Sequence, residues 1–471
     1  MQDVIGTLGT SGVPHEATAA DDRDRRFPPE AAIDRPLLRA AFACVSDCGD
    51  LLVSTARSGR SARTFIYLTI AIDALGLGLL VPVMPQLIET LSGHGLRQAA
   101  VYAGAITALF ATMQFVAAPV LGSLSDRYGR RPVLLASLAA FGVNYLLMAF
   151  APTLAWLFVA QGLAGIFGAT PSTAAAYIAD VSEPEERPRL FGLLGASFGV
   201  GFMLGPVIGG LLVELDLRVP FFAAAGLALI NVLYGALVLP ESLAPELRQP
   251  FQLARANPLG ALLHLKNHHL AGSLLLALLL LHVANHALPA TWPFFTMHSF
   301  GWTPSMVGYS LGLFGICTIV TQGAFVGHIV RRYGVSRSLY LGLTATIVGF
   351  CGFAFAPNAW LLVLLIPPAT MGYMSASLLA SLLSTQVPPT MQGTLQGVVA
   401  SLRSLAAIIT PITMAPLFSK FASKTAIVYL PGAPYVVAGA LAALCIWLVS
   451  RSTRAEPIQA SLHGQKDAPA P

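Results

Sequence analysis

Charged side chains are scarce in this sequence. Of its 471 residues, 27 are Lys or Arg and 22 are Asp or Glu, so 10% are charged, where a soluble domain carries about 25%. Hydrophobic residues make up 55%, and the mean hydropathy is +0.70. So few charges cannot cover so much apolar surface in water, which excludes a soluble or a disordered chain. The composition predicts a protein that crosses a membrane many times.

Several chemical motifs are also missing. The five cysteines form no disulfide framework or metal-ligand set. None of the four lysines follows a glycine, so there is no G-K-[ST] phosphate loop and no sign of an ATP-driven mechanism. No nucleophile elbow, carboxylate pair or His/Asp cluster lies in an apolar segment. We therefore expect no enzyme, no cofactor and no metal site. The formal charge of +5 indicates basic loops at a membrane rather than nucleic-acid binding.

Twelve apolar segments are long enough to span about 30 Å of hydrocarbon. They cover residues 64–87, 100–121, 132–151, 154–179, 190–213, 219–239, 270–298, 304–330, 338–357, 359–384, 394–418 and 427–449. The expected fold is an all-α membrane protein with twelve transmembrane helices in two six-helix bundles. The bundles are expected at 64–239 and 270–450, joined by a loop at 240–269. Residues 1–63, expected to be disordered, and 451–471 are expected to be tails.

Basic residues are divided unequally between the two sets of segment ends. Sixteen Lys or Arg lie at one set of ends and four at the other. Positive charge concentrates on the cytoplasmic side of a membrane. The imbalance therefore predicts that both tails and the central loop are cytoplasmic.

The two halves share an internal repeat. GSLSDRYGR at 122–130 follows the second segment, and GHIVRRYGV at 327–335 follows the eighth. Four residues of these loops match at a shift of 205 positions, and Pro206 matches Pro411 at the same shift. Two similar six-helix halves with a site between them are a known plan of secondary transporters.

The loop after the second segment carries the most specific motif. Its glycines allow a tight turn between two helices, and a carboxylate beside that turn can form breakable contacts with helix-end amides or arginines. The loop resembles the G-x-L-x-D-R-x-G-R-[KR] signature of the major facilitator superfamily, which implies that fold and a gate on the cytoplasmic side. The matching residues are Gly122, Asp126, Arg127, Gly129, Arg130 and Arg131.

The fifth segment is rich in glycine around a proline. Glycines spaced by four let two helices touch backbone to backbone, and an internal proline bends a helix. Ordinary close packing would explain the same pattern. The G-P-x-x-G-G form resembles the fifth-helix motif that the superfamily associates with antiporters, which implies efflux. The motif consists of Gly201, Gly205, Pro206, Gly209 and Gly210.

A closer resemblance covers most of residues 64–450. It rests on IDALGLGLLVPVMPQL at 72–87, MQFVAAPVLGSLSDRYGRRPVLL at 113–135, AYIADVSEPEERPRLFG at 176–192, NHALPATW at 285–292 and QGTLQG at 392–397. These segments are similar to the tetracycline-efflux branch of drug/proton antiporters. The resemblance implies a monomeric multi-pass pump of the inner (cytoplasmic) membrane. Its partners would be the lipid bilayer, protons and a small-molecule drug, which could arrive chelated to a metal.

The sequence departs from that branch at three positions. The family carries acids in its third and ninth helices and an arginine in its fourth. This chain has Asn144, Thr346 and Gln161 at the matching positions, and none of them can hold a proton near neutral pH.

Asp73 is the one carboxylate well inside an apolar segment, because no acid occurs from Leu247 to Ala455. Burying an ionised acid in a membrane costs about 2.5–3.5 kcal/mol on insertion scales. We therefore expect Asp73 to take up and release protons as its surroundings change.

Three further ionisable side chains lie in apolar segments of the second half. Arg403 is expected to pair with Asp73, to bind an anionic group of the substrate, or to extend toward a membrane interface. His282 and His286 lie one helical turn apart. With Asn285 they could relay protons, or they could only form hydrogen bonds between helices.

Other side chains are candidates for the wall of a substrate cavity, although most such residues simply bond across helices. The candidates are Gln114, Asn144, Gln161, His286, Gln322 and Arg403. Trp292, Phe294 and Phe295 could stack on a planar drug or form an interfacial aromatic belt.

The predicted function is proton-coupled efflux of a drug such as tetracycline by alternating access. The alternatives are export of other drugs or transport of another small solute or metabolite by the same fold, which the three departures favour. A membrane-embedded enzyme is disfavoured for lack of a catalytic cluster. The sequence does not exclude a transporter-like receptor that does not transport.

Overall fold

The apolar segments of the sequence form α-helices, because a chain in hydrocarbon must satisfy its backbone hydrogen bonds internally. The computed structural model describes residues 59–168, 170–183, 185–251, 269–387 and 391–455, and these ranges contain no strand. The predicted tails, apart from 59–63 and 451–455, and most of the predicted central loop lie outside the described residues.

Eight helices make up the first half. They are α2 (Gly59–Leu80), α3 (Met84–Ser92), α4 (Leu96–Tyr128), α5 (Arg130–Ala149), α6 (Leu154–Ile166), α7 (Thr170–Asp180), α8 (Arg187–Leu212) and α9 (Val219–Val238), followed by the short 3-10 helix η1 (Pro245–Leu247). The second half contains α11 (His269–Phe300), α12 (Pro304–Val320), the π-helical turn η3 (Thr321–Phe325), α13 (Val326–Ala354), α14 (Ala359–Leu364), α15 (Ile366–Thr385), α16 (Gln392–Phe421) and α17 (Ala433–Ala455).

Eleven described helical stretches are long and apolar enough to cross a membrane. One of them, Pro304–Ala354, has 51 residues and would be about 77 Å long as a straight helix, more than twice the hydrocarbon thickness. It is interrupted at Gly334, whose φ of 78° and ψ of 166° are not helical. This stretch therefore contributes two spans, and the prediction of twelve helices is confirmed.

The interruption at Gly334 repeats the one at Gly129. Gly129 separates α4 from α5 with a φ of 108° and a ψ of 161°, and the two glycines stand 205 positions apart, which is the shift of the sequence repeat. Both adopt a backbone conformation open almost only to glycine. The repeat is thus a repeat of local structure.

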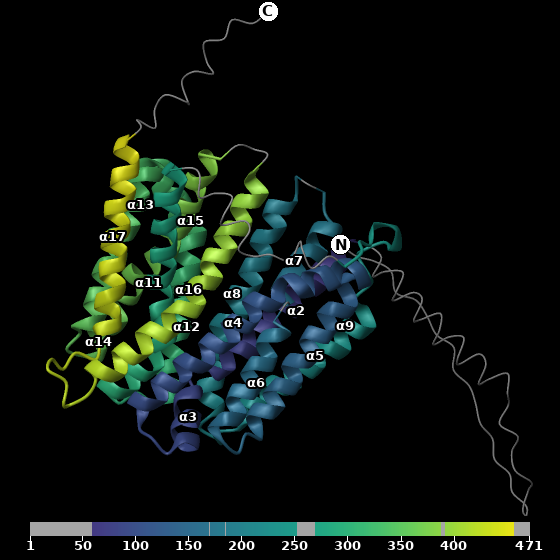
Figure 1. Ribbon diagram of the computed structural model, residues 1–471. Helices are drawn as coiled ribbons and strands as arrows, with labels where there is room; N and C mark the ends of the chain where they lie inside the picture. Colours follow the sequence, from purple (N-terminus) through teal and green to yellow (C-terminus); the bar gives the residue numbers. More distant parts are fainter. Residues whose placement is uncertain (1–58, 169, 184, 252–268, 388–390, 456–471) are drawn as a thin grey trace, which may run out of the picture. The chain divides into compact units, whose positions relative to one another are not determined.

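The described chain begins and ends on the same side of the bundle, which we call the terminal side (Figure 1). Near the start of α2, the Arg63 guanidinium donates hydrogen bonds to Glu186 and to the Val181 carbonyl oxygen, beside the loop after α7. Near the end of α17, the Ser452 hydroxyl lies 2.7 Å from that of Ser273 at the start of α11. The opposite side is called the far side.

The two halves meet through α4 against α16 and α8 against α12. At the far side this contact is backbone to backbone. A methyl group at Gly104 of α4 would lie 2.6 Å from the Pro411 carbonyl oxygen of α16. One at Gly210 of α8 would lie 2.7 Å from the Pro304 carbonyl oxygen of α12. Such distances leave no room for a side chain, so the far side is closed.

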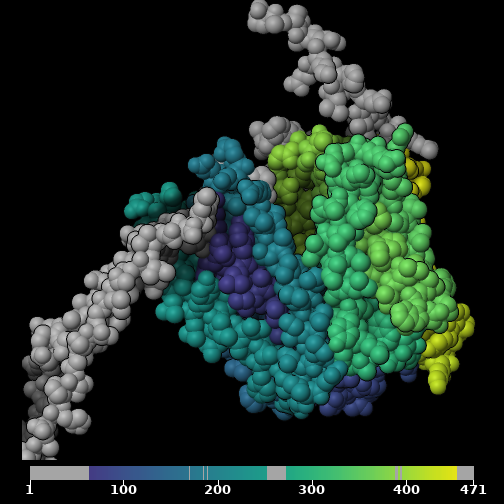
Figure 2. Space-filling model, turned by 180° about the vertical axis from the view of Figure 1, so that it is seen from behind, coloured from purple at the N-terminus to yellow at the C-terminus, as the bar shows by residue number. Residues whose placement is uncertain are grey.

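The same helices separate toward the terminal side. A methyl group at Gly195 or Gly199 of α8, at Gly327 of α13 or at Gly397 of α16 would meet nothing within 4 Å. Figure 2 shows the resulting hollow between the blue-teal surface of the first half and the green surface of the second, narrowing away from the terminal side. The structure is therefore open to the terminal side.

The aromatic residues of α11 lie in the core of the second half. Trp292 is 1%, Phe294 4% and Phe295 3% exposed. The Trp292 indole donates a hydrogen bond to Ser310 and packs edge-on against Phe353 and Tyr435. These side chains form neither the drug-stacking surface nor the interfacial belt that the sequence suggested.

Candidate functional site

Asp73 lies two-thirds of the way along α2 and is 8% exposed. Among the described residues, none forms an ion pair with its carboxylate or donates a hydrogen bond to it. Asn231 of α9 fixes the helix one turn earlier, where its amide donates to the Thr69 carbonyl oxygen at 3.0 Å. Asp73 is thus held at a fixed place in the bundle without a partner that would stabilise its charge.

Two neighbours pack on α2 at the level of Asp73. The first is α8, whose Gly201 and Gly205 pack on the backbone of Ala71, Leu75 and Gly78, the face of α2 turned away from Asp73; a methyl group at Gly205 would lie 2.6 Å from the Leu75 carbonyl oxygen. The second is Tyr145 of α5, whose hydroxyl approaches the turn of α2 after Asp73 and would lie 3.2 Å from a methyl group at Gly76. The Tyr145 hydroxyl is buried and has no hydrogen-bond partner.

The glycine motif of α8 is divided between two neighbours. Gly201, Gly205 and Gly209 face α2 of the same half, while Pro206 and Gly210 contact α12 of the other half. The motif therefore joins the helix of Asp73 to the interface between the halves.

The three positions that depart from the related antiporters are packed or weakly bonded. Asn144 is buried, and its amide lies 3.7 Å from the Met148 sulfur, which the Gln161 amide contacts at 3.4 Å. Thr346 is fully buried and donates a hydrogen bond to the Gly342 carbonyl oxygen of its own helix at 2.7 Å. None of the three can replace a carboxylate in proton exchange.

Several polar residues of the second half lie on helices that contact the helix of Arg403. The Arg403 side chain is exposed in mid-α16, and α16 packs against α11, which carries His282 and His286, and contacts α15, which carries Tyr373. The two imidazole centroids lie 6.5 Å apart, and His286 Nδ1 is 2.8 Å from the His282 carbonyl oxygen. No ion pair between Arg403 and Asp73 occurs in the described structure.

The other cavity candidates lie apart from this cluster. The Gln114 amide donates to the Gly168 carbonyl oxygen at 2.8 Å, at the break between α6 and α7. Gln322 is exposed in the π-helical turn η3. Neither contacts Asp73 or Arg403.

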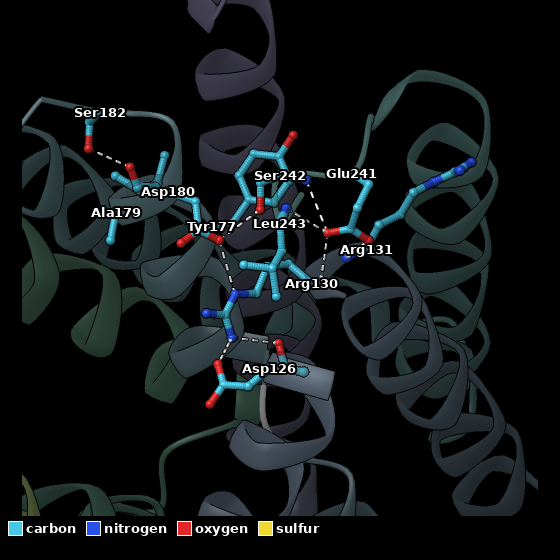
Figure 3. Close-up of polar contacts among 12 residues, drawn as sticks. Asp126, Arg130, Arg131, Tyr177, Ala179, Asp180, Ser182, Glu241, Ser242 and Leu243 are labelled. Carbon is cyan, nitrogen blue, oxygen red and sulfur yellow. Dashed lines mark hydrogen bonds and ion pairs between the residues drawn. The ribbon is translucent and has the colours of Figure 1, made fainter. Parts of the chain in front are cut away.

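The loop at residues 122–131, which we call the gate loop, is the centre of a charge cluster on the terminal side (Figure 3). Arg130 forms ion pairs with Asp126 at 2.5 Å and with Asp180, at the end of α7, at 3.0 Å. Arg131 donates to the Ala236 carbonyl oxygen of α9 at 2.6 Å. Arg127 lies over the Tyr128 ring, and a methyl group at Gly122 would meet nothing within 4 Å. Among the described residues, the hydrogen-bond and ion-pair partners of Arg130 and Arg131 belong to the first half or to the segment directly after it.

Sequence reasoning missed Glu241 and Asp180 in this cluster. Glu241 accepts hydrogen bonds from the backbone amides of Arg130 and Arg131 at 2.7 and 3.2 Å, at the helix end where a negative charge is favourable. Ser242 donates to Asp180 at 3.0 Å. The only sequence signal was their place in the chain: Glu241 lies just after the sixth apolar segment, and Asp180 just after the fourth.

Two halves of six spans, a hollow between them that is open on one side, and a buried acid define a membrane transporter. The chain belongs to the Major Facilitator Superfamily, because the model of that family matches residues 66–411.

Similar proteins place it more closely. It is 37% identical over 386 residues to the tetracycline resistance protein, class C, of Escherichia coli, covering 82% of this chain and 96% of that one. It is 35% identical to the class G protein of Vibrio anguillarum, covering 83% and 98%. The human organic anion transporter MFSD10 has the same fold, with a TM-score of 0.64 and 23% identity over 83% of this chain and 99% of that one.

These matches confirm several predictions from the sequence. They confirm the fold class and the membrane embedding of the chain. They also confirm that it is a small-molecule transporter rather than an enzyme, and that it is similar to the drug-efflux members of the superfamily.

Proposed function

We propose that this protein exports a drug such as tetracycline, or a related small molecule, in exchange for protons. The observation that carries the proposal is the Asp73 carboxylate, buried on α2 with no ion pair or hydrogen bond from the described residues. An acid without such partners is stable in its neutral form and becomes ionised only when water or a ligand reaches it. Its proton can therefore be coupled to the opening of the site.

The terminal side is proposed to face the cytoplasm of an inner membrane, with the protein acting as a monomer. The sixteen basic residues that the sequence places at one set of segment ends, against four at the other, support this orientation. The structure is then an inward-open state. In the outward-open state Asp73 takes up a proton as the drug leaves, and in the inward-open state it releases the proton and the next drug binds.

The charge cluster at the gate loop is proposed to close the cytoplasmic side. In the inward-open state Arg130 neutralises both Asp126 and Asp180 within the first half. The Asp126 side chain is nevertheless 46% exposed, so it remains free to exchange part of this pairing for groups of the second half when the hollow closes. Alternating access would then include making and breaking this contact.

His282 and His286 are proposed to assist in proton transfer. His286 Nδ1 is held by the His282 carbonyl oxygen, which leaves its Nε2 for a transferred proton. Replacing both histidines with Asn should reduce the protons released per drug molecule. Full coupling in the double variant removes them from the proton path.

Everted membrane vesicles test the main proposal. They would be energised and offered tetracycline together with cationic and neutral drugs, while the release of luminal protons is followed by a pH-sensitive dye. The wild type should release protons on drug addition, and Asp73→Asn should behave like empty vesicles. Glu246→Gln removes an exposed acid of η1 and should behave like the wild type. Transport by Asp73→Asn that is unchanged and independent of the pH gradient would overturn the role of Asp73.

The substrate panel also covers the second candidate function, export of a different solute. The observation that favours it is the uncharged character of the Asn144 and Gln161 contacts around Met148, where the related pumps carry charge. Proton release with another compound of the panel but not with tetracycline would assign that substrate.

A further inference from the structure

Arg403 is an ionised side chain at membrane depth whose charge is not balanced by the protein. It lies eleven residues after the start of α16, which is about 16 Å along the helix axis, so the chain cannot easily carry its guanidinium to the membrane surface. The sequence holds no acid from Leu247 to Ala455, and among the described residues no carboxylate pairs with Arg403. Something other than this half must compensate the charge.

The space next to Arg403 is accessible to water. The side chain is exposed, and an arginine that remains exposed at this depth must face water rather than lipid. The hollow on the terminal side is the water-accessible space between the halves (Figure 2), and α16 borders open space at Gly397, six residues before Arg403, where a methyl group would meet nothing within 4 Å. A solute that enters the hollow can therefore reach the guanidinium.

Unpartnered polar atoms accompany the charge. His282 Nε2 is buried without a hydrogen-bond partner, and Asn285 Oδ1, on a residue that is 4% exposed, is also unpartnered. Buried polar atoms normally have partners. His282 lies on α11, which packs against the helix of Arg403, so a ligand bound beside Arg403 can supply the partner that His282 lacks among the described residues.

An aromatic pair lies on neighbouring helices. Tyr373 of α15, a helix that contacts both α16 and α12, packs edge-on against Phe314 of α12 with ring centroids 5.9 Å apart. Both rings are only partly buried. Aromatic faces stack on planar conjugated groups, while a guanidinium pairs through two parallel N–H bonds with an anion that offers two neighbouring oxygens.

We propose that Arg403, with His282 and Tyr373, binds an anionic group on the exported molecule, so that the substrates are planar conjugated organic anions with paired oxygens. This inference rests on the proposed export function and specifies its substrate class. The anion takes the place of the missing protein carboxylate, and the proton-exchanging Asp73 stays in the other half. The anion site is then separate from Asp73, although it shares His282 with the proposed proton transfer.

Two matched probes test the proposal. 2-Naphthoate carries the two oxygens of a carboxylate on a planar ring system, and 2-naphthamide is its neutral counterpart of nearly the same shape. Binding of each to the purified full-length protein in detergent would be measured by equilibrium dialysis. We expect the wild type to bind naphthoate at least about tenfold more tightly than naphthamide, a difference of 1.4 kcal/mol.

The variants isolate the guanidinium. Arg403→Gln should remove the preference for naphthoate and leave naphthamide binding within about twofold, while Arg403→Lys, which keeps the charge but not the paired N–H groups, should retain part of it. Arg451→Gln removes an arginine that lies 4.3 Å over the Trp447 ring near the end of α17 and should keep the full preference. Equal binding of both probes by the wild type, or a full preference in Arg403→Gln, would overturn the inference.

The proton-release assay on the same preparations separates this inference from the proposed function. If drugs drive proton release but the anion preference is absent, the substrate class is wrong and the export function stands. If the preference depends on Arg403 but no compound drives proton release, the anion site stands and the export function is wrong.

Discussion

Glu241 caps the helix that begins at Arg130, with its carboxylate oxygen 2.7 Å from the Arg130 backbone nitrogen. The same carboxylate accepts from the amides of Arg131, Ser242 and Leu243. The segment after α9 is thereby fixed to the start of α5, next to the gate loop. Arg130 thus takes part in both features: its backbone amide donates to the cap, and its side chain pairs with Asp126 and Asp180.

Loss of this cap should weaken the first half. Glu241→Ala leaves the first amides of α5 without their acceptor, and we expect a loss of about 0.5–2 kcal/mol in the free energy of unfolding, as for other N-terminal caps. Thermal unfolding in detergent measures the change. Glu246→Ala, an exposed acid five residues later, serves as the control and should leave the unfolding temperature as it is. Equal effects of the two variants would contradict the cap.

Gly129 and Gly334 form a natural pair for a test of the loop. Both have backbone angles that strain any other residue by about 1–3 kcal/mol. Gly129→Ala should destabilise the protein more than Gly334→Ala, since its methyl group would also strike the Glu241 carboxylate, whereas a methyl group at Gly334 meets nothing within 4 Å. Unfolding temperatures of the two variants rank the effects, and the reverse order would refute the prediction.

Two glycines of α8 should respond oppositely to alanine. A methyl group at Gly205 would lie 2.6 Å from Gly78 Cα, so Gly205→Ala should push α8 from α2 and cost about 1–3 kcal/mol. A methyl group at Gly199 would meet nothing within 4 Å in the open state, so Gly199→Ala should be neutral or stabilise by helix propensity, by about 0.5–1 kcal/mol. Thermal unfolding of the protein in this state, open to the terminal side, distinguishes them. A similar loss in both would show that Gly199 is already packed.

The far side is closed by one hydrogen bond between side chains of the two halves as well as by backbone contact. Ser305 of α12 donates to Glu214, just after α8. Ser305→Ala should lower the stability of the closed far side by about 1 kcal/mol and raise the outward-open population about fivefold. Spin labels at positions 97 and 419, on α4 and α16, would report longer distances. Ser197→Ala, which loses only a bond to its own helix, should leave the distances unchanged, and an unchanged distribution in Ser305→Ala would exclude this contribution.

Much of the fold could be predicted from the sequence because each span is a local property. Each of the twelve predicted segments overlaps a described helix, and the repeat at a shift of 205 identified both Gly129 and Gly334 as turns between spans. The helix α2 begins at Gly59, so its first, polar turn lies before the start of the predicted apolar segment.

The contacts between distant residues could not be predicted. Glu241 reaches Arg130 across 111 positions, and no local pattern encodes that pairing. The same holds for Arg403, for which the sequence left three possibilities open. The described residues show no ion pair between Arg403 and Asp73, and α16 packs against α11, the helix of His282, and contacts α15, the helix of Tyr373. Which side of the bundle is open depends on small differences between two packings of the same helices, and a sequence must permit both.

The close contacts of Gly104 with Pro411 and of Gly210 with Pro304 have a consequence for the permeability of the bundle to protons. Backbone that touches backbone leaves no layer of mobile side chains through which water could thread while the hollow is open on the other side. Water files conduct protons, so a looser closure would let protons cross the bundle independently of any transported solute. The small residues at the far side thus seal the bundle against a proton leak.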